Sequence, residues 1–361
     1  MTSGRARARD LGLAPGRLPT GPANTVTDVP GIRVGQLTLI EGSDIRTGVS
    51  AVVPDALTGS DPARRPNLPA GLAVFNGFGK MVGTTQITEL GTIETPVLLT
   101  STLSVFRVAD ALLSYLHERP GYVDMATLNP VVAETNDGYL SDIWARPITE
   151  EHVRAALEGA AAGPVAEGCV GAGTGTGALG YKAGIGTSSR VCDLSTGPVT
   201  LGVLVQANFG GELTVLGVPC PPPAMTAAPV DQDDGQHAGN SCVIVLATDA
   251  KFDSRQLTRL AGRAFGGMAR AGSDFSGRSG DYALAISTAE QQRAADEDGP
   301  VPDKDLDLLF LAAIEATEEA ILNSLFMAVT TTGFGGRTRL AVPLDYVTAR
   351  VSSRSARRYE S

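Results

Sequence analysis

The sequence of 361 residues predicts an α+β fold built from layers of sheet and helix. Strand-like and helical segments follow one another irregularly, which favours this class over a doubly wound parallel sheet with strict strand–helix alternation. A hydrophobic content of 43% against a charged content of 19% is sufficient for a large core. The 43 glycines and only 5% aromatic residues indicate closely packed layers of small side chains joined by tight turns.

Strands and helices are predicted from the spacing of apolar and β-branched residues. The predicted strands are residues 32–39, 96–101, 130–134, 199–208, 242–248 and 282–288. The predicted helices are residues 105–118, 150–159, 254–270 and 304–328. Asp253 and Gln256 have the spacing of a capping box at the start of the third helix, and Asp303 is the predicted cap of the fourth.

The charge pattern limits the partners. A net charge of -10 argues against a nucleic-acid partner or an anionic membrane surface. The sequence contains no run of about 18 apolar residues, so no membrane span is predicted. The basic start lacks the apolar segment of a secretion signal. A cytoplasmic location is therefore expected. Arg5, Arg7 and Arg9 in that basic start are predicted to form a solvated tail.

Cysteine and histidine usage argues against metal and cofactor chemistry. The four cysteines form no CxxC pair and are expected to be buried free thiols. The three histidines are scattered, so neither a zinc site nor a histidine-dependent triad is expected. Gly175, Gly177 and Gly180 match the GxGxxG spacing, but no convincing strand precedes them, so no dinucleotide cofactor is predicted. We expect no metal and no cofactor.

The junction between Asn240 and Ser241 is the strongest candidate for chemistry. Residues 221–240 contain four prolines and three aspartates and then give way to a continuously apolar strand. A hydroxyl at this junction can attack the preceding carbonyl, and hydrolysis of the resulting ester leaves Ser241 with a free α-amine. That amine has a pKa of about 7.7–8.0, so it can serve as a base without histidine. The ordinary alternative is a serine that only begins a strand, and Cys242 is a rival nucleophile predicted to face the other way.

Other polar groups collect at strand ends. Ser279 and Asp281 precede a second apolar strand, and Glu134 to Tyr139 end another. Asn208 ends a further strand with an amide that suits an oxyanion donor. Each patch alone is also consistent with an ordinary polar turn, although polar groups at the end of a buried strand are costly unless they are paired or functional.

Together these segments resemble the L-aminopeptidase/D-esterases and β-peptidyl aminopeptidases, a self-processing family of serine N-terminal-nucleophile-like hydrolases. The similarity spans nearly the whole chain, through motifs in family order. These are TDVPGIRVG from Thr27, FNGFGK from Phe75, AETNDG from Ala133, GIGTSSR from Gly184, QAN from Gln206, the Asn240/Ser241 junction, SGD from Ser279 and EEAILN from Glu318.

The resemblance implies one αββα sandwich over residues 1–361, similar to N-terminal nucleophile hydrolases but with different connectivity. It implies self-cleavage into an α chain, 1–240, and a β chain, 241–361. Such α/β heterodimers assemble into homo-oligomers, and a tetramer of heterodimers is expected.

The family's catalytic residues transfer to matching positions. Ser241 matches the nucleophile, and Ser279 matches the serine that orients it or relays its proton. Asp281 matches the family carboxylate, although some members have the longer Glu there. Asn208 matches the oxyanion asparagine, and Tyr139 matches a tyrosine beside the oxyanion.

The implied activity is that of an exo-acting serine aminopeptidase or amidase. Glu134 matches the acid that binds the free amine of a short peptide, amide or ester substrate. An endo-acting amide-oligomer hydrolase or a transacylase remains open within the family, although the nylon-oligomer hydrolases have Thr where this chain has Ser241. A processed but non-catalytic binding protein is the alternative from another class.

Overall fold

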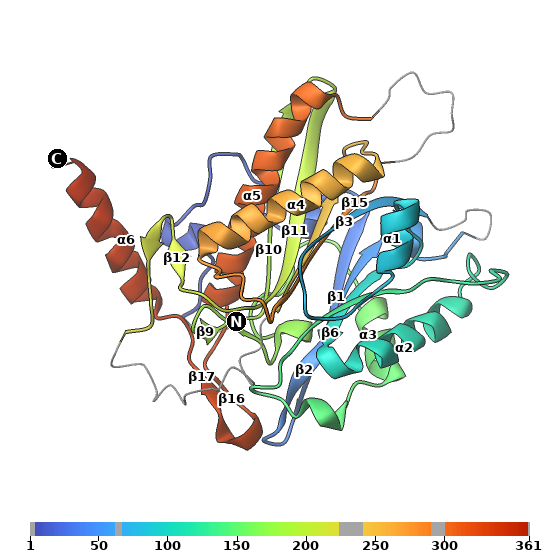
Figure 1. The fold of residues 1–361 in the computed structure, drawn as a ribbon, viewed down its shortest axis with the longest axis horizontal. Coiled ribbons are helices and arrows are strands. Elements are labelled where there is room, and N and C mark those ends of the chain that lie inside the picture. The colour runs from blue at the N-terminus through green and yellow to red at the C-terminus, as the bar shows by residue number, and fades with distance from the viewer. Residues whose placement is uncertain (1–3, 62–66, 224–240, 290–299, 360–361) are drawn as a thin grey trace.

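The structure is a computed structural model of the chain, and it describes residues 4–61, 67–223, 241–289 and 300–359 (Figure 1). The five-stranded sheet has the order β1 (Ile32–Glu41), β2 (Ile45–Pro54), β6 (Val97–Ser101), β7 (Val131–Thr135) and β4 (Met81–Val82). The six-stranded sheet has the order β10 (Ile185–Leu194), β11 (Gly197–Asn208), β14 (Ser241–Thr248), β15 (Gly280–Ser287), β3 (Leu68–Gly77) and β5 (Thr92–Ile93).

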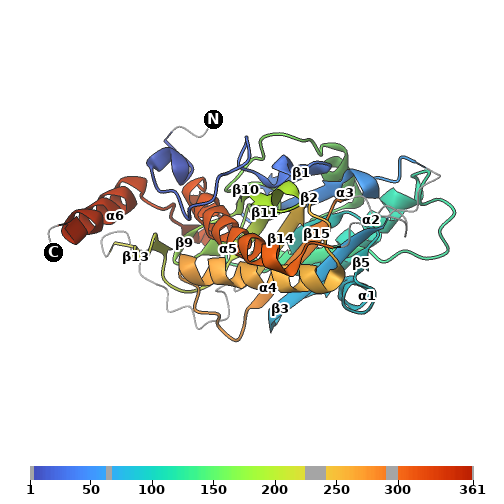
Figure 2. The same cartoon turned by 90° about the horizontal axis from the view of Figure 1, so that it is seen from above.

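Helices and short hairpins complete the chain. The helices are α1 (Thr84–Leu90), α2 (Val105–His117), α3 (Glu150–Glu158), α4 (Ser254–Ala271), α5 (Asp303–Phe326) and α6 (Leu344–Tyr359). The two-stranded pairs are β8 (Gly177–Ala178) with β9 (Tyr181–Lys182), β12 (Thr214–Val215) with β13 (Val218–Pro219), and β16 (Thr331–Thr332) with β17 (Thr338–Arg339). Figure 2 shows α6 extending away from the layers at one end.

The apolar core divides into three clusters, one for each contact between layers. The first joins α4 and α5 to one face of the six-stranded sheet. The second lies between the two sheets and contains residues of β7, β14 and β15. The third joins α2 and α3 to the outer face of the five-stranded sheet. The architecture is therefore the four-layer αββα sandwich that the resemblance implied (Figure 1).

The predicted elements are all present, with ends that shift by at most two residues. Strong periodicity and good caps explain this agreement. Asp253 accepts a hydrogen bond from the Gln256 backbone nitrogen at 2.7 Å, which confirms the predicted capping box. The predicted N-cap of α5 was wrong by one position, because Pro302 is the N-cap and Asp303 is the first residue of the helix.

Strand β10 was not predicted, because its residues lack the apolar character of a core strand. A Cβ at Gly186 would clash with the Ala320 carbonyl oxygen, so α5 packs directly on the strand backbone. Ser188 Oγ donates to the Ala316 carbonyl at 2.6 Å. Small and polar residues are required here by the approaching helix, and periodicity alone does not show this.

The prediction of a solvated basic tail was wrong. Arg7 pairs with Glu167 at 2.8 Å, and Arg9 pairs with fully buried Glu319 at 2.8 Å. Arg190, itself fully buried, also reaches Glu319 at 2.8 Å. The N-terminal segment is thus held against β10 and α5 by ion pairs whose acidic partners lie far away in the sequence.

Two smaller findings concern membrane-spanning helices and the cysteine thiols. Within the described residues, no helix is both long and apolar enough to cross a membrane. All four cysteines are free, as expected, and three of them are buried, whereas Cys169 is half-buried.

Candidate active site

Ser241 is the first residue of β14, in the middle of the six-stranded sheet. Strand β11 runs antiparallel to β14 and places Asn208 directly opposite Ser241. Strand β15 runs parallel to β14 and places Gly280 beside Ser241. The Gly280 backbone nitrogen donates to Ser241 Oγ at 3.3 Å, and the serine is only 3% exposed. The hydroxyl therefore has a fixed environment at the start of a central strand.

The two faces of β14 separate Ser241 from Cys242. Val243 belongs to the core between the two sheets, whereas Cys242 belongs to the core beneath α4 and α5. Because side chains alternate along a strand, Ser241 faces the five-stranded sheet and Cys242 faces the helices. Burial raises the pKa of the Cys242 thiol well above its usual range. The prediction that Cys242 faces away from Ser241 is confirmed.

Ser279 and Asp281 form a hydrogen-bonded pair at the start of β15. Ser279 Oγ donates to Asp281 Oδ1 at 2.6 Å, and Asn76 Nδ2 donates to Asp281 Oδ2 at 2.9 Å. Burial raises the pKa of the Asp281 carboxyl, and the hydrogen bonds from Ser279 and Asn76 partly oppose that rise. The shorter aspartate reaches Ser279 without difficulty. Asn76 was not predicted as a site residue, although it lies in the FNGFGK segment.

Asn208 is held by bonds at both ends of its amide. Its Oδ1 accepts from the Gly177 backbone nitrogen at 3.1 Å, and its Nδ2 donates to the Asn136 carbonyl at 2.8 Å. An amide nitrogen carries two hydrogens, so the bond to Asn136 uses one of them. Asn208 faces the same side of the sheet as Ser241, because residues directly opposite in an antiparallel pair point the same way.

Glu134 is a buried carboxylate that is only half satisfied. Its Oε1 accepts from the Lys80 backbone nitrogen at 2.9 Å, and Lys80 Nζ lies 3.4 Å from the same oxygen. Glu134 is 2% exposed, and its Oε2 has no hydrogen-bond partner among the described residues. Glu134 Oε1 and the Tyr282 hydroxyl both lie against Gly79, where an added Cβ would be 3.2 Å from the first and 3.1 Å from the second.

The position of Glu134 relative to the serine follows from the strand register. Tyr282 is opposite Val243, two positions along from Ser241, and both belong to the core between the sheets. The pKa of the Tyr282 hydroxyl is raised first by burial and then by the Glu134 charge. Glu134 therefore lies on the β15 side of the serine, and its buried Oε2 has no hydrogen-bond partner among the described residues.

Tyr139 lies on the opposite, β11 side of the site. The Arg339 guanidinium stacks over its ring at 4.1 Å, and the Arg337 guanidinium lies 5.3 Å from the ring centre. Arg339 also lies against Gly177, where an added Cβ would be 3.2 Å from the arginine Nε. Gly177 in turn donates to Asn208. The two arginines were missed by sequence reasoning, because they come from the β16–β17 hairpin, far from every recognised motif.

The loop that joins these groups contains a second buried carboxyl, Asp137. Ser101 Oγ donates to its Oδ1 at 2.7 Å. Burial raises the pKa of Asp137 to about 6, and hydrogen bonds partly oppose the rise. The Asp137 carbonyl accepts from the Leu140 and Ser141 backbone nitrogens, which fixes the turn that carries Asn136 and Tyr139.

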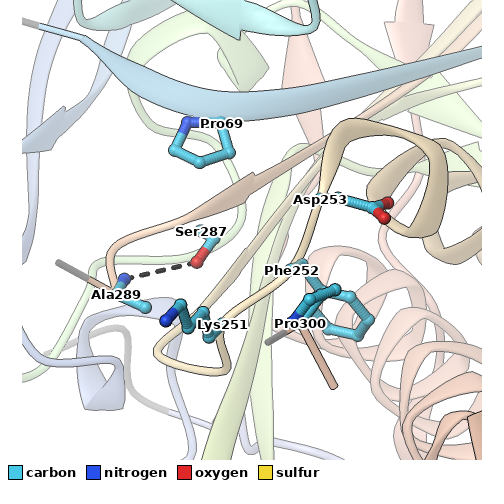
Figure 3. Close-up of a pocket in the computed structure, with 7 residues that line it drawn as sticks. All are labelled: Pro69, Lys251, Phe252, Asp253, Ser287, Ala289 and Pro300. Atoms are coloured by element: carbon cyan, nitrogen blue, oxygen red, sulfur yellow. Dashed lines mark hydrogen bonds between the residues drawn. The ribbon is translucent and has the colours of Figure 1, made fainter. Parts of the chain in front are cut away.

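Two cavities lie near these strands. One, of about 220 Å³, is lined by Asn136, Gly138, Ser141, Asp142, Ile143, Trp144, Phe334 and Arg337, and so adjoins the carbonyl that holds Asn208. The other, also about 220 Å³, includes Ser287 and Lys251 at the far end of β14 and β15 (Figure 3). It contains none of the predicted site residues. Among the described residues, no group of three histidine, cysteine or carboxylate side chains could hold a metal ion.

Comparison with known proteins gives a consistent answer. The chain matches the model of peptidase family S58 over residues 24–339. The beta-peptidyl aminopeptidase BapA of Sphingosinicella microcystinivorans is 40% identical over 364 residues, which cover 93% of this chain and 89% of that protein.

Solved structures agree with the sequence match. An L-aminopeptidase D-Ala-esterase/amidase from Ochrobactrum anthropi, described as a prototype of the serine aminopeptidases and a new variant of the Ntn hydrolase fold, matches with a TM-score of 0.86 and 36% identity. That match covers 97% of this chain and 99% of the other. A β-aminopeptidase from Burkholderia sp. matches with a TM-score of 0.83 and 37% identity, over 96% of this chain and 99% of the other.

The layers, the serine at the head of a central strand and these matches define a hydrolase of peptide or amide bonds of the serine aminopeptidase type. The chain belongs to peptidase family S58. The family resemblance inferred from the sequence is thereby confirmed.

Proposed function

We propose that the chain cleaves itself between Asn240 and Ser241 and then acts as an exo-aminopeptidase or amidase with Ser241 as its N-terminal nucleophile. Asn240 lies outside the described residues, so the cleavage itself stays a prediction. The observation that carries the proposal is the position of Ser241, which begins a buried strand with Asn208 on one side and the Gly280 nitrogen on the other.

The proposed reaction begins with attack of Ser241 Oγ on the acyl carbon of the substrate. The hydroxyl proton moves to the freed α-amine of Ser241, and then to the leaving amine as the bond to the acyl carbon breaks. Water hydrolyses the resulting ester and regenerates the serine. Ser279, held by Asp281 at 2.6 Å, orients the nucleophile or relays its proton.

The negative oxygen of the tetrahedral intermediate needs preorganised donors. The second hydrogen of Asn208 Nδ2 is one such donor, since its first hydrogen is engaged by the Asn136 carbonyl. Tyr139 is proposed to support this side of the site. Both ends of the Asn208 amide are fixed before substrate arrives, so little reorganisation is needed during the reaction.

Glu134 is proposed to bind the substrate's free amine. A buried carboxylate oxygen without a partner carries a desolvation cost that an incoming ammonium would remove. Lys80 contacts the other oxygen, so the carboxylate is positioned without being fully paired. The names of the proteins that this chain resembles suggest β-amino acid amides, L-amino acid amides and D-alanine esters as the first substrates to try.

We also propose that the processed α/β heterodimers assemble into a homo-oligomer, with a tetramer of heterodimers as the first expectation. Val74, Phe75 and Phe78 support a contact between copies, because they are 50%, 54% and 69% exposed. A cytoplasmic location is proposed from the four free thiols.

The test compares Ser241→Ala with the wild-type protein by intact mass and by turnover of amino acid p-nitroanilides. Wild-type protein should separate into two chains, the smaller beginning at Ser241, whereas the alanine variant should remain whole and inactive. Cys242→Ala is the matched control, because that thiol faces the helices; it should still be cleaved and active. Full activity of Ser241→Ala would refute the proposed nucleophile.

The same measurements separate the alternatives. Turnover of N-acetylated substrates as fast as free-amine substrates would favour the endo-amidase, and a product formed with an added amine would favour the transacylase. Cleavage of the chain without covalent labelling of Ser241 by an active-site acylating agent would favour the non-catalytic binding protein.

A further inference from the structure

The cavity beside Asn136 has the features of a binding site for the part of the substrate that leaves. Its walls combine apolar Ile143, Trp144 and Phe334 with the guanidinium of Arg337. Its volume of about 220 Å³ is below the ~300–1,000 Å³ of pockets that enclose drug-sized ligands. A single amino acid is therefore a suitable occupant.

Arg337 is fixed in this cavity by contacts that do not use all of its donors. Its Nε donates to the Phe334 carbonyl at 3.0 Å, and one terminal nitrogen donates to the Gly138 carbonyl at 3.1 Å. Its guanidinium also lies 5.1 Å from the Phe334 ring centre. A guanidinium has five N–H donors, so donors remain. Among the described residues, no carboxylate forms an ion pair with Arg337.

The charge around the cavity favours an anion at one position. Asp142 also lines the cavity, but its carboxylate accepts from the Trp144 and Ala145 backbone nitrogens at 3.0 and 3.4 Å. Both bonds are accepted by Oδ1 and cap the short 3-10 helix Ile143–Ala145. Arg339, stacked on Tyr139, adds a second positive charge on this side of the site.

The cavity lies near Glu134, because one of its lining residues is a close neighbour of Glu134 in the chain. Asn136, which lines the cavity, follows Glu134 by two residues just beyond the end of β7, so their Cα atoms lie at most about 7 Å apart. Two residues of extended peptide span at most about 7 Å. Glu134 lies on the β15 side of Ser241, and Asn136 contacts Asn208 on the β11 side. An amine held at Glu134 thus directs the opposite end of a short peptide toward Arg337.

We propose that this cavity is the leaving-group subsite and that Arg337 binds the C-terminal carboxylate of a short peptide substrate. The inference rests on the proposed exo-aminopeptidase function and adds the substrate class, which is dipeptide-sized molecules with both ends free. Arginine suits this task because its planar donors match a carboxylate in a bidentate geometry.

The experiment compares two substrates that share one acyl group with a free amine. One ends in leucine with a free carboxylate, and the other ends in leucinamide. Wild-type enzyme should cleave the carboxylate form about 10- to 100-fold more efficiently in kcat/KM, mainly through KM. In Arg337→Gln this ratio should fall toward one, and Arg337→Lys should restore part of it because a point charge remains.

Arg350→Gln is the matched control, because Arg350 also donates to a backbone carbonyl, that of Pro219, and stacks on a ring, that of Tyr346, but lies outside the cavity. It should keep the wild-type ratio. Free leucine should inhibit wild-type enzyme more strongly than leucinamide, and this difference should disappear in Arg337→Gln.

Three results would overturn the inference. A wild-type ratio near one, with p-nitroanilides still cleaved, rejects the carboxylate site and leaves the aminopeptidase function standing. Equal losses on both peptides in Arg337→Gln and Arg337→Lys, with a lowered melting temperature, assign Arg337 a purely structural role. If neither the peptides nor any p-nitroanilide is cleaved, the proposed function and this inference fail together.

Discussion

Asn208 lies directly opposite Ser241 in the antiparallel pairing of β11 and β14, and both side chains face the layer between the two sheets. This arrangement places an amide donor beside a hydroxyl on two strands that cannot shift independently. The Gly177 nitrogen and the Asn136 carbonyl fix the amide from both ends.

The first prediction concerns this amide. Asn208→Ala should lower kcat by about 10²–10³-fold and leave KM nearly unchanged, because an oxyanion donor acts mainly in the transition state. Steady-state kinetics on a p-nitroanilide measure this split. Asn129→Ala, which removes an exposed amide bonded to Glu94, serves as the control. A larger effect on KM than on kcat would show that Asn208 is not an oxyanion donor.

The second prediction concerns Glu134 and the free amine. N-acetylated p-nitroanilides should be hydrolysed at least ~100-fold more slowly than free-amine versions, because acetylation removes the ammonium and leaves Glu134 Oε2 unpaired. A charge-assisted hydrogen bond is worth about 1.5–3 kcal/mol, or roughly 10- to 150-fold. Glu134→Gln should narrow the gap by slowing the free-amine substrate.

The design is a comparison of wild type and Glu134→Gln on both substrates, with Glu118→Gln as control, since Glu118 is an exposed partner of Arg154 on the surface. If acetylation makes no difference to wild type, Glu134 is only a structural partner of Lys80 and the exo-acting mechanism is wrong.

The third prediction is the pH dependence of catalysis. If the Ser241 α-amine is the base, kcat/KM should rise through an apparent pKa near or somewhat below about 7.7–8.0, because only the neutral amine accepts the proton. Ser279→Ala should raise the pKa of Asp281 further, since it removes a donor that stabilises the charged carboxylate. A profile that is flat from about pH 5 to 9 contradicts the α-amine mechanism.

The fourth prediction is a pH-dependent stability caused by Asp137. Its pKa of about 6 in the folded protein exceeds the ordinary 3.8, so the folded state binds more protons between these values. The stabilising contribution is complete below pH ~4 and is lost as pH rises through about 6, a change of at most about 3 kcal/mol.

The melting temperature should therefore fall less between pH 4.5 and 7.5 in Asp137→Asn than in wild type. The difference between the melting-temperature curves of wild type and Asp137→Asn isolates the effect of Asp137. Other buried acids such as Glu167, whose raised pKa of about 7 also lowers stability as pH rises, contribute equally to both curves. Asp55→Asn, at an exposed ion pair with Arg33, should match wild type. Parallel curves for Asp137→Asn and wild type would show that Asp137 does not titrate in this range.

The sequence by itself determined the strongly periodic elements and the candidate residues at their ends. The apolar run that becomes β14, the capping box at Asp253 and the helical spacing of apolar residues along α4 are local patterns, so they identify elements without tertiary contacts. The family motifs then assigned roles to Ser241, Ser279, Asp281, Asn208, Tyr139 and Glu134.

Only the tertiary structure decided which of these groups meet. The register of β11, β14 and β15 brings Asn208, Ser241 and Gly280 side by side, although 32 residues separate the first two and 38 the last two in the numbering. Asn76, Lys80 and Arg337 join Asp281, Glu134 and the leaving-group cavity through contacts between distant segments.

The basic N-terminal segment shows the same division. Its composition is that of a solvated tail, yet Arg9 is bound to buried Glu319 of α5. The composition of a segment indicates how it interacts with water, whereas the position of this segment in the folded protein depends on charged residues of distant elements. Those charges become partners only when the layers have assembled. For that reason only the fold decided the positions of the N-terminal segment and of Arg337 and Arg339 beside the active site.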